Sequence, residues 1–168
     1  PGPRRLRIRK ATEDQFGKYY CLPGSDGDSP LTINFDFAPD FVPAIVVESE
    51  LDAILLSQEI KPLFAFVATG STSNGPSEDL LENLRQRPFV LISLDNDGAG
   101  GKASWEKWLG ALESAERAPV PASWGKDHTE AFLSGHDLSG VWIDACCKIM
   151  GDGLPPFQED GAQNGAFK

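Results

Sequence analysis

Cysteine is scarce in this chain, and the three cysteines present have no metal-binding arrangement. Cys21, Cys146 and Cys147 form no Cys-x-x-Cys pair, and no histidine lies at a spacing suited to zinc. Adjacent residues such as Cys146 and Cys147 are also poor partners for a disulfide bond. We therefore expect buried thiols, and neither a zinc site nor a disulfide framework.

Long apolar runs are missing as well. The sequence has no stretch of about 18 apolar residues, so it predicts no helix that spans a membrane and no membrane partner. The chain begins with Pro1, without an initiator methionine or an apolar leader. We expect it to be a piece of a longer cytoplasmic protein.

Basic residues are few outside the start of the chain. The net charge is -10; residues 1–20 hold six Lys and Arg against two acids, and the remainder holds nine against 23. Such a charge repels a phosphate backbone, so a protein of this kind needs divalent cations or a basic neighbouring domain to work on nucleic acid. The alternative is that the acids only keep the surface soluble.

Apolar residues make up 40% of the 168 residues, which is enough for one buried core. Unbroken apolar runs at 44–47, 63–67 and 89–94 are each followed by a helix-like stretch. Continuous apolar strands that alternate with helices predict an α/β fold, with a central parallel sheet flanked by helices.

The flanking segments differ from this pattern. Short alternating runs at 6–9, 18–22 and 31–34, with turn-forming residues between the last two, predict a small antiparallel β lobe. The end of the chain is rich in Gly, Pro and polar residues. We therefore expect a basic β lobe over residues 1–40, an α/β domain over 41–150 and a loose tail over 151–168.

The helices carry their own signals. Ser49 is expected to cap the first helix, with Asp52 as a weaker capping-box partner. In the third helix, apolar residues recur at helical spacing, which predicts an aromatic stripe packed on the sheet. That stripe consists of Trp105, Trp108, Leu109 and Leu112.

Acids follow two of the predicted strands directly. Glu48 ends the first strand, and Asp95 and Asp97 follow the third. If these strands are neighbours, the three carboxylates form a cluster of hard oxygen ligands suited to Mg²⁺ or Mn²⁺. Gly98 and Gly100 then open a helix, where free N–H groups suit an anion. The alternative for residues 95–98 is an ordinary turn.

Residues 47–53 together with residues 95–100 resemble the Toprim pattern, which bacterial DNA primases, topoisomerases, small nucleases and recombination proteins share. The similarity extends from Phe41 to Leu133. It implies a Toprim-like, Rossmann-like fold in which Glu48, Asp95 and Asp97 bind metal and assist phosphoryl transfer.

Two further segments resemble the primase branch, in particular phage- and plasmid-like primases. The turn with Gly70 and Ser71 implies nucleotide contacts, and residues 125–132 resemble a primase Gly-x-Asp-Pro-x-Asp segment. The second match implies Asp127 and Glu130 as additional metal-binding acids. For Glu130 the alternative is a solvated acid at a helix start. Lys126 is expected either to contact phosphate or to be a surface lysine.

The chain departs from the primase pattern at three positions. Ser49 stands in place of a glycine, His128 in place of a proline, and Gly101 in place of a basic residue, which leaves Lys102 to supply charge near the nucleotide. His128 is either a phosphate or metal contact or, as is commoner for one histidine in a loop, a surface residue.

Other Toprim activities fit less well. The only tyrosines, Tyr19 and Tyr20, lie in the expected β lobe, which argues against a topoisomerase, and the cysteine motifs of recombination Toprim proteins are absent. We therefore expect a DNA primase domain that joins ribonucleotides on a single-stranded DNA template.

The primase resemblance implies an upstream zinc-binding domain, and in some members a helicase domain, elsewhere in the protein. Arg5, Arg7 and Arg9 are expected to touch nucleic acid, or else to keep a strand edge solvated. The alternatives are a Toprim nuclease that uses water as the attacking group, a non-catalytic module that binds nucleotide or metal, and a pure interaction domain.

Overall fold

A five-stranded mixed sheet forms the centre of this computed structural model, which describes residues 7–14, 17–24, 30–36, 41–60, 63–70, 75–95, 98–140 and 142. The strand order is β3-β5-β4-β6-β7. The elements are β1 (Arg7–Asp14), β2 (Gly17–Cys21), β3 (Leu31–Ile33), β4 (Ala44–Val47), α1 (Glu50–Glu59), β5 (Ala65–Ala68), α2 (Glu78–Arg85), β6 (Val90–Ile92), α3 (Gly98–Ala111), β7 (Ala115–Arg117) and α4 (His128–Leu133).

Four strands of this sheet run parallel. β4 pairs with β5 on one side and with β6 on the other, β7 pairs with β6, and β3 is antiparallel to β5 at the edge. All residues of β4, β5 and β6 are buried, as expected for strands covered on both faces. The predicted α/β class is therefore confirmed.

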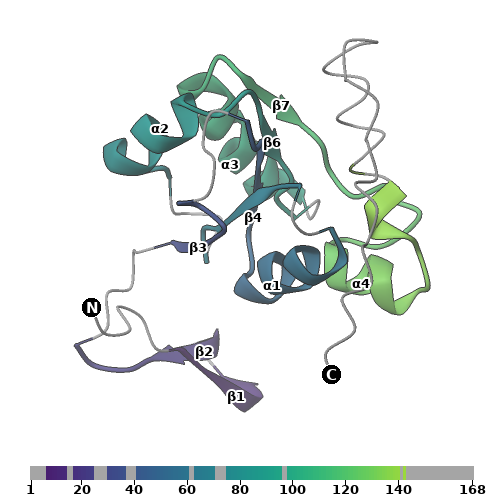
Figure 1. Cartoon of the computed structure of the whole chain (residues 1–168). Coiled ribbons are helices and arrows are strands. Elements are labelled where there is room, and N and C mark those ends of the chain that lie inside the picture. Colours follow the sequence, from purple (N-terminus) through teal and green to yellow (C-terminus); the bar gives the residue numbers. More distant parts are fainter. Residues whose placement is uncertain are drawn as a thin grey trace, which may run out of the picture.

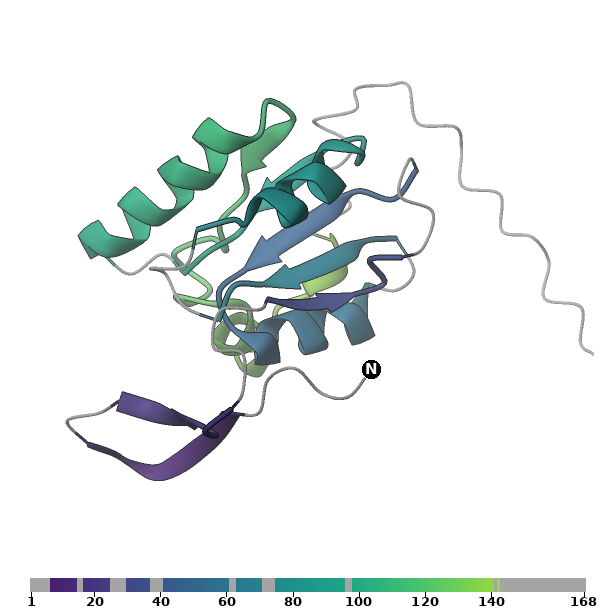
Figure 2. The same ribbon diagram turned by 90° about the vertical axis from the view of Figure 1, so that its left-hand side faces the viewer.

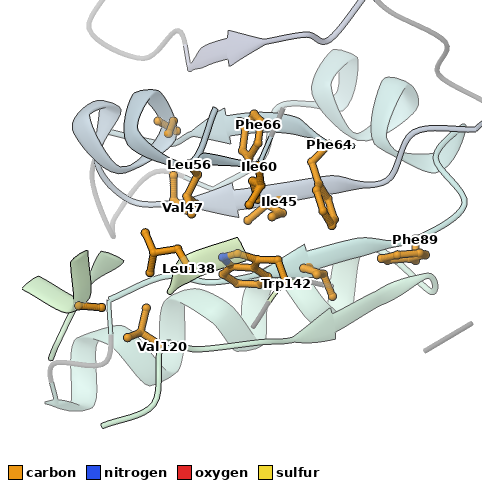
Figure 3. Packing of buried hydrophobic residues seen from close by; sticks show 14 residues of the cluster. Ile45, Val47, Leu56, Ile60, Phe64, Phe66, Phe89, Val120, Leu138 and Trp142 are labelled. Carbon is orange, nitrogen blue, oxygen red and sulfur yellow. The ribbon is translucent and has the colours of Figure 1, made fainter. Parts of the chain in front are cut away.

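Helices cover the two faces of the sheet in pairs. Figures 1 and 2 show α2 and α3 on one face, and α1 with α4 on the other. Because side chains alternate along a strand, Ala44 and Val46 pack toward α2 and α3, whereas Ile45 and Val47 face the opposite core. Figure 3 shows the second core, in which Trp142 lies among residues of the sheet and α1.

The predicted Ser49 cap and the predicted aromatic stripe agree with the structure, whereas the Asp52 carboxylate, expected as a capping-box partner, accepts from Thr129. The Ser49 side chain caps α1 by accepting a hydrogen bond from the Asp52 N–H at 3.1 Å. Trp108 on α3 and Leu112 directly after it are buried against the sheet, and Trp105 packs partly buried beside them. The aromatic stripe is therefore core, as expected.

The start of the chain differs in one respect from the prediction. β1 and β2 form an antiparallel hairpin, which Figures 1 and 2 show apart from the larger sheet. The third short strand was expected in the same lobe, but β3 pairs with β5 instead. Its apolar Leu31 and Ile33 pack against the core on the α1 side, which gives β3 a partner that the hairpin does not offer.

Residues 143–168 lie outside the described residues, so the predicted boundary at 150 and the predicted tail stay predictions. The pairing of β3 with β5 places residues 31–33 in the larger sheet rather than in the lobe predicted for residues 1–40. Among the helices that are described, none combines the length and the apolar character needed to cross a membrane.

Candidate active site

The carboxyl ends of β4, β5 and β6 lie side by side and bring three loops together. The sequence left open whether the strands before Glu48 and Asp95 are neighbours, and the pairing of β4 with β6 shows that they are. Beyond the last register pair, the Ser93 N–H donates to the Val46 carbonyl at 2.8 Å. Glu48 and Asp95 therefore leave adjacent strands at the same edge, where α/β sheets bind ligands.

The turn after β5 meets the same edge. The Gly70 N–H donates to the Glu48 carbonyl at 2.7 Å, and the Thr69 N–H donates to the Val47 carbonyl at 3.0 Å. Gly70 has a φ of 75°, a left-handed conformation that favours glycine. The predicted nucleotide-binding turn thus begins beside Glu48, whereas Ser71 lies outside the described residues.

Asp95 lies in a strongly acidic environment. Its side chain is only 15% exposed, and burial together with the charges of Glu48, Asp52 and Asp127 raises its pKa to about 7. The charge of Lys126 acts in the opposite direction. Either a bound proton or a bound cation relieves such repulsion. Because the pKa lies near neutral pH, a cation can displace the proton from this carboxyl group.

Lys126 provides the positive charge at this position. Its Nζ atom lies 2.6 Å from Asp127 Oδ2 and 3.8 Å from Asp95 Oδ2. The hydrogen bond with Asp127 raises the pKa of Lys126. Burial acts to raise the pKa of Asp127, but the hydrogen bonds from Lys126 and from the Glu130 N–H outweigh it and lower that pKa. Lys126 therefore bridges two of the predicted metal-binding acids.

Asp127 and Glu130 shape the loop that carries Lys126. Asp127 caps α4, because its Oδ1 atom accepts from the Glu130 N–H at 2.8 Å. Glu130 Oε2 in turn accepts from the Lys126 N–H at 3.0 Å. A Cβ atom at Gly125, whose φ is 144°, would lie 2.6 Å from the Glu130 Cβ. This packing requires a glycine at position 125.

Three residues at this edge were not assigned to the site from the sequence, namely Asp52, Ser93 and Thr129. Asp52 is 2% exposed, and its Oδ1 atom accepts from the Thr129 N–H at 3.0 Å and from the Thr129 hydroxyl at 2.6 Å. The Ser93 Oγ atom lies 3.1 Å from the Nε2 atom of His128. Asp52 shares the buried face of α1 with Ala53 and Leu56, whereas the apolar Leu51 and Ile54 are exposed, so the apolar pattern of this helix did not indicate it.

His128 is not a surface residue. It is 2% exposed, and its ring lies 5.4 Å from that of Trp142. Burial lowers its pKa to about 4, so the imidazole is neutral at pH 7. The expectation of a surface side chain was wrong because α4 packs its first turn against the sheet, which buries a ring that a loop would expose.

Other predicted residues lie apart or outside the description. Lys102 on α3 forms an exposed ion pair with Glu106 at 3.6 Å, Gly98 and Gly100 lie in the first turn of α3, and Arg7 and Arg9 lie in β1. Asp97 and Arg5 lie outside the described residues.

Within the described ranges, no three Asp, Glu, His or Cys side chains form a group that could hold a metal. The predicted cluster of Glu48, Asp95 and Asp97 therefore stays a prediction.

The chemistry of the donors nevertheless fits a hard divalent cation. Carboxylate oxygens from Glu48, Asp95 and Asp127 are the ligand type that Mg²⁺ and Mn²⁺ prefer. The raised pKa of Asp95 reflects its burial first and then the negative charges of neighbouring acids, which Lys126 offsets only in part. A cation at this edge would remove that repulsion.

A protein-family model described as Toprim-like matches residues 45–131, which are 87 of the 168 residues. This range contains Glu48, Asp95, Asp127 and Glu130. None of the curated proteins matches the chain.

Several solved structures share the fold. The primase fragment of the bacteriophage T7 primase-helicase protein is 17% identical with a TM-score of 0.54, over 79% of this chain and 53% of that chain. A DNA primase domain from Pseudomonas aeruginosa is 21% identical with a TM-score of 0.56, over 88% and 46%. The Aquifex aeolicus primase, with zinc-binding and RNA polymerase domains, is 18% identical with a TM-score of 0.56, over 86% and 36%. At these identities the likeness concerns the fold.

Proposed function

Because the chain belongs to the Toprim-like family, we propose that it is the metal-dependent catalytic domain of a DNA primase, which joins ribonucleotides into an RNA primer on single-stranded DNA. The observation that supports this most is the burial of Asp95 among other acids at the carboxyl edge of the sheet, which raises its pKa to about 7. The fold shared with primase domains from a phage and two bacteria agrees with this proposal.

In this proposal, Glu48, Asp95, Asp97 and Asp127 hold Mg²⁺ or Mn²⁺, and Glu130 supports the loop beside them. The bound ions supply positive charge for the triphosphate and for the charge that develops at the transferring phosphorus. Gly70 and Ser71, with Gly98 and Gly100 on the other side, approach the phosphates through their backbone, and Lys126 and Lys102 contribute positive charge. The 3′-hydroxyl of the primer attacks the α-phosphate, its proton passes to solvent, and pyrophosphate leaves.

The rest of the machinery is proposed to lie outside this chain. The chain spans 53% of the phage primase fragment and 46% of the Pseudomonas primase domain. We propose a zinc-binding domain upstream, a helicase domain in the same cytoplasmic protein, and template contacts by Arg5, Arg7 and Arg9. Positive charge on the hairpin suits a phosphate backbone that the acidic remainder of the chain repels.

Calorimetric titration with Mn²⁺ and Mg²⁺ tests the proposed site. We expect wild type to bind and the double variant Asp95→Asn/Asp97→Asn to lose binding. The matched control is Asp79→Asn/Glu82→Gln, which also removes two negative charges, but from the exposed face of α2. Loss of binding in the control as well would mean that general charge, rather than the site, attracts the ion.

Product analysis then tests the reaction. We expect oligoribonucleotides from ribonucleotides, Mg²⁺ or Mn²⁺ and single-stranded DNA, with the chain in its full-length protein. Shortened nucleic acid without added nucleotides would indicate a nuclease instead. Metal binding without turnover in the full-length protein would indicate a non-catalytic module, and absence of metal binding in wild type would contradict the proposal.

A further inference from the structure

Two hydrogen-bonded contacts, one buried and one partly buried, join the first turn of α4 to the segments that carry the acids. They involve consecutive residues, His128 and Thr129, directly after Asp127. His128 contacts the segment after β6, and Thr129 contacts α1. Neither contact belongs to the sheet or to the Asp127 cap of α4, so both hold α4 against the edge where the acids lie.

The first contact links α4 to β6. The Ser93 Oγ atom and the His128 Nε2 atom are 3.1 Å apart, and both residues are almost fully buried. Ser93 precedes Asp95 by two residues, and its backbone continues the ladder with β4. A displacement of His128 would therefore move Asp127 relative to Asp95.

The second contact links α4 to α1. Asp52 Oδ1 accepts from both the N–H and the hydroxyl of Thr129, at 3.0 and 2.6 Å. Asp52 lies in the first turn of α1, which begins directly after Glu48 and Ser49. A bond between a buried carboxylate and two donors of one residue is strong and directional. This second contact fixes the position of Asp127 relative to Glu48, and the first contact fixes its position relative to Asp95.

The segment held in this way has little other support. α4 has six residues, and residues 118–127 before it form no helix or strand. Lys126 and Asp127 are also partly exposed. A short helix after an irregular loop is too small to set the position of a side chain to within a fraction of an ångström by itself.

We infer that His128 and Thr129 are positioning residues, which hold Asp127 and Lys126 opposite Asp95 and Glu48 through Ser93 and Asp52. This inference rests on the proposed function, since it concerns the same site. His128 does not reach a nucleotide itself, because it is 2% exposed and points into the core beside Trp142. Its lowered pKa agrees with a neutral hydrogen-bonding partner.

The test measures Mn²⁺ affinity of the full chain by calorimetry, together with the paramagnetic resonance spectrum of the bound ion. Ser93→Ala removes the hydroxyl that meets His128, and Thr129→Val removes the hydroxyl that meets Asp52. Loss of a residue that orients a metal ligand weakens binding by about 10-fold or more. We expect such a loss for each variant, with a changed spectrum.

Conservative and matched variants separate positioning from folding. Thr129→Ser keeps the hydroxyl and should restore wild-type affinity. Ser57→Ala removes a buried hydroxyl that donates to the Ile54 carbonyl on α1 at 2.7 Å, and it should leave affinity unchanged. If Ser93→Ala fails to fold, the comparison of Thr129→Val with Thr129→Ser still decides the question.

The outcomes for the two proposals are distinct. Wild-type affinity and spectrum in folded Ser93→Ala and Thr129→Val would overturn the positioning role and leave the metal site standing. Wild type that binds no Mn²⁺ would overturn the proposed function, and the positioning role with it.

Discussion

The two faces of the central sheet are covered in different ways. On the α2 and α3 face, Trp108, Leu84 and Leu112 form an apolar layer. On the α1 and α4 face, buried Asp52 and His128 stand beside the apolar core and bond across elements. The polar contacts lie at the carboxyl edge, near Asp95. The first face is thus packed by apolar side chains, whereas the second combines an apolar core with hydrogen-bonded polar groups.

The largest effect on stability is expected from a substitution in the apolar layer on the α2 and α3 face. Trp108 is 1% exposed, and replacing a buried Trp by Ala typically costs about 3–5 kcal/mol of unfolding free energy. We expect Trp108→Ala to lower stability by that amount in denaturant unfolding. Where the variant is still folded, its Mn²⁺ affinity should equal that of wild type. A large loss of affinity would mean that the two faces are not separable.

A smaller loss of stability is expected on the other face, combined with a loss of binding. Asp52→Ala removes the acceptor of two Thr129 hydrogen bonds, and each bond to a charged group is worth about 1.5–3 kcal/mol. We expect reduced stability and weaker Mn²⁺ binding together. Asp52→Asn keeps an acceptor and serves as the control, which should lose less of both. Equal effects of the two variants would contradict the role of the hydrogen bonds.

The pH dependence of the metal-free protein isolates Asp95. Its folded pKa of about 7 lies above the unfolded value of about 3.9. Its contribution to stability is therefore fully present below pH 4 and is lost as pH rises through 7. We expect Asp95→Asn to remove this decline, which runs from about pH 4 to about pH 7, measured as the difference in melting temperature from wild type. His128 changes in the opposite sense, through its lowered pKa, in both proteins.

The same titration affects metal binding. A proton and a cation compete for the Asp95 carboxylate, so Mn²⁺ affinity in wild type should rise between pH 6 and 8. Thermal unfolding with and without Mn²⁺ at each pH measures this competition. An affinity that does not change over this range would contradict the assignment of Asp95 to the metal site.

The smallest expected effect concerns Lys126. Its side chain is 48% exposed, so its ion pairs contribute little to stability in water. Lys126→Gln should lower the melting temperature of the metal-free protein slightly, because Asp95 and Asp127 then repel without a counter-charge. Mn²⁺ affinity should rise, since no positive group competes at the acids. Lys107→Gln, which removes an equal charge from an exposed position on α3, should leave both unchanged.

Much of the fold could be predicted from local patterns. The apolar runs that became β4, β5 and β6 are long enough and uniform enough to indicate strands buried on both faces. Ser49 and the tryptophan stripe of α3 were also recognisable, because capping and helical spacing depend on residues only three or four positions apart. β3 was assigned to the wrong lobe, because the sequence of a three-residue strand does not indicate which strand it pairs with.

The site was predictable in part for the same reason. The position of an acid directly after a strand is visible in the sequence, and the Toprim-like resemblance is confirmed by the family match. The roles of Glu48, Asp95, Asp97 and Asp127 remain predictions. Asp52 and His128 were misjudged, because their bonding partners are 77 and 35 residues away along the chain.

The sequence by itself determined which segments become strands and helices, and which of them end in acids, since these properties follow from neighbours in the chain. Only the tertiary structure decided that β4 and β6 are adjacent, that α4 folds back against α1, and that His128 is buried. The physical reason is that pairing and burial depend on groups brought together by the whole chain. The raised pKa of Asp95 has the same origin, because burial and charges from α1 and from the loop before α4 act on it together.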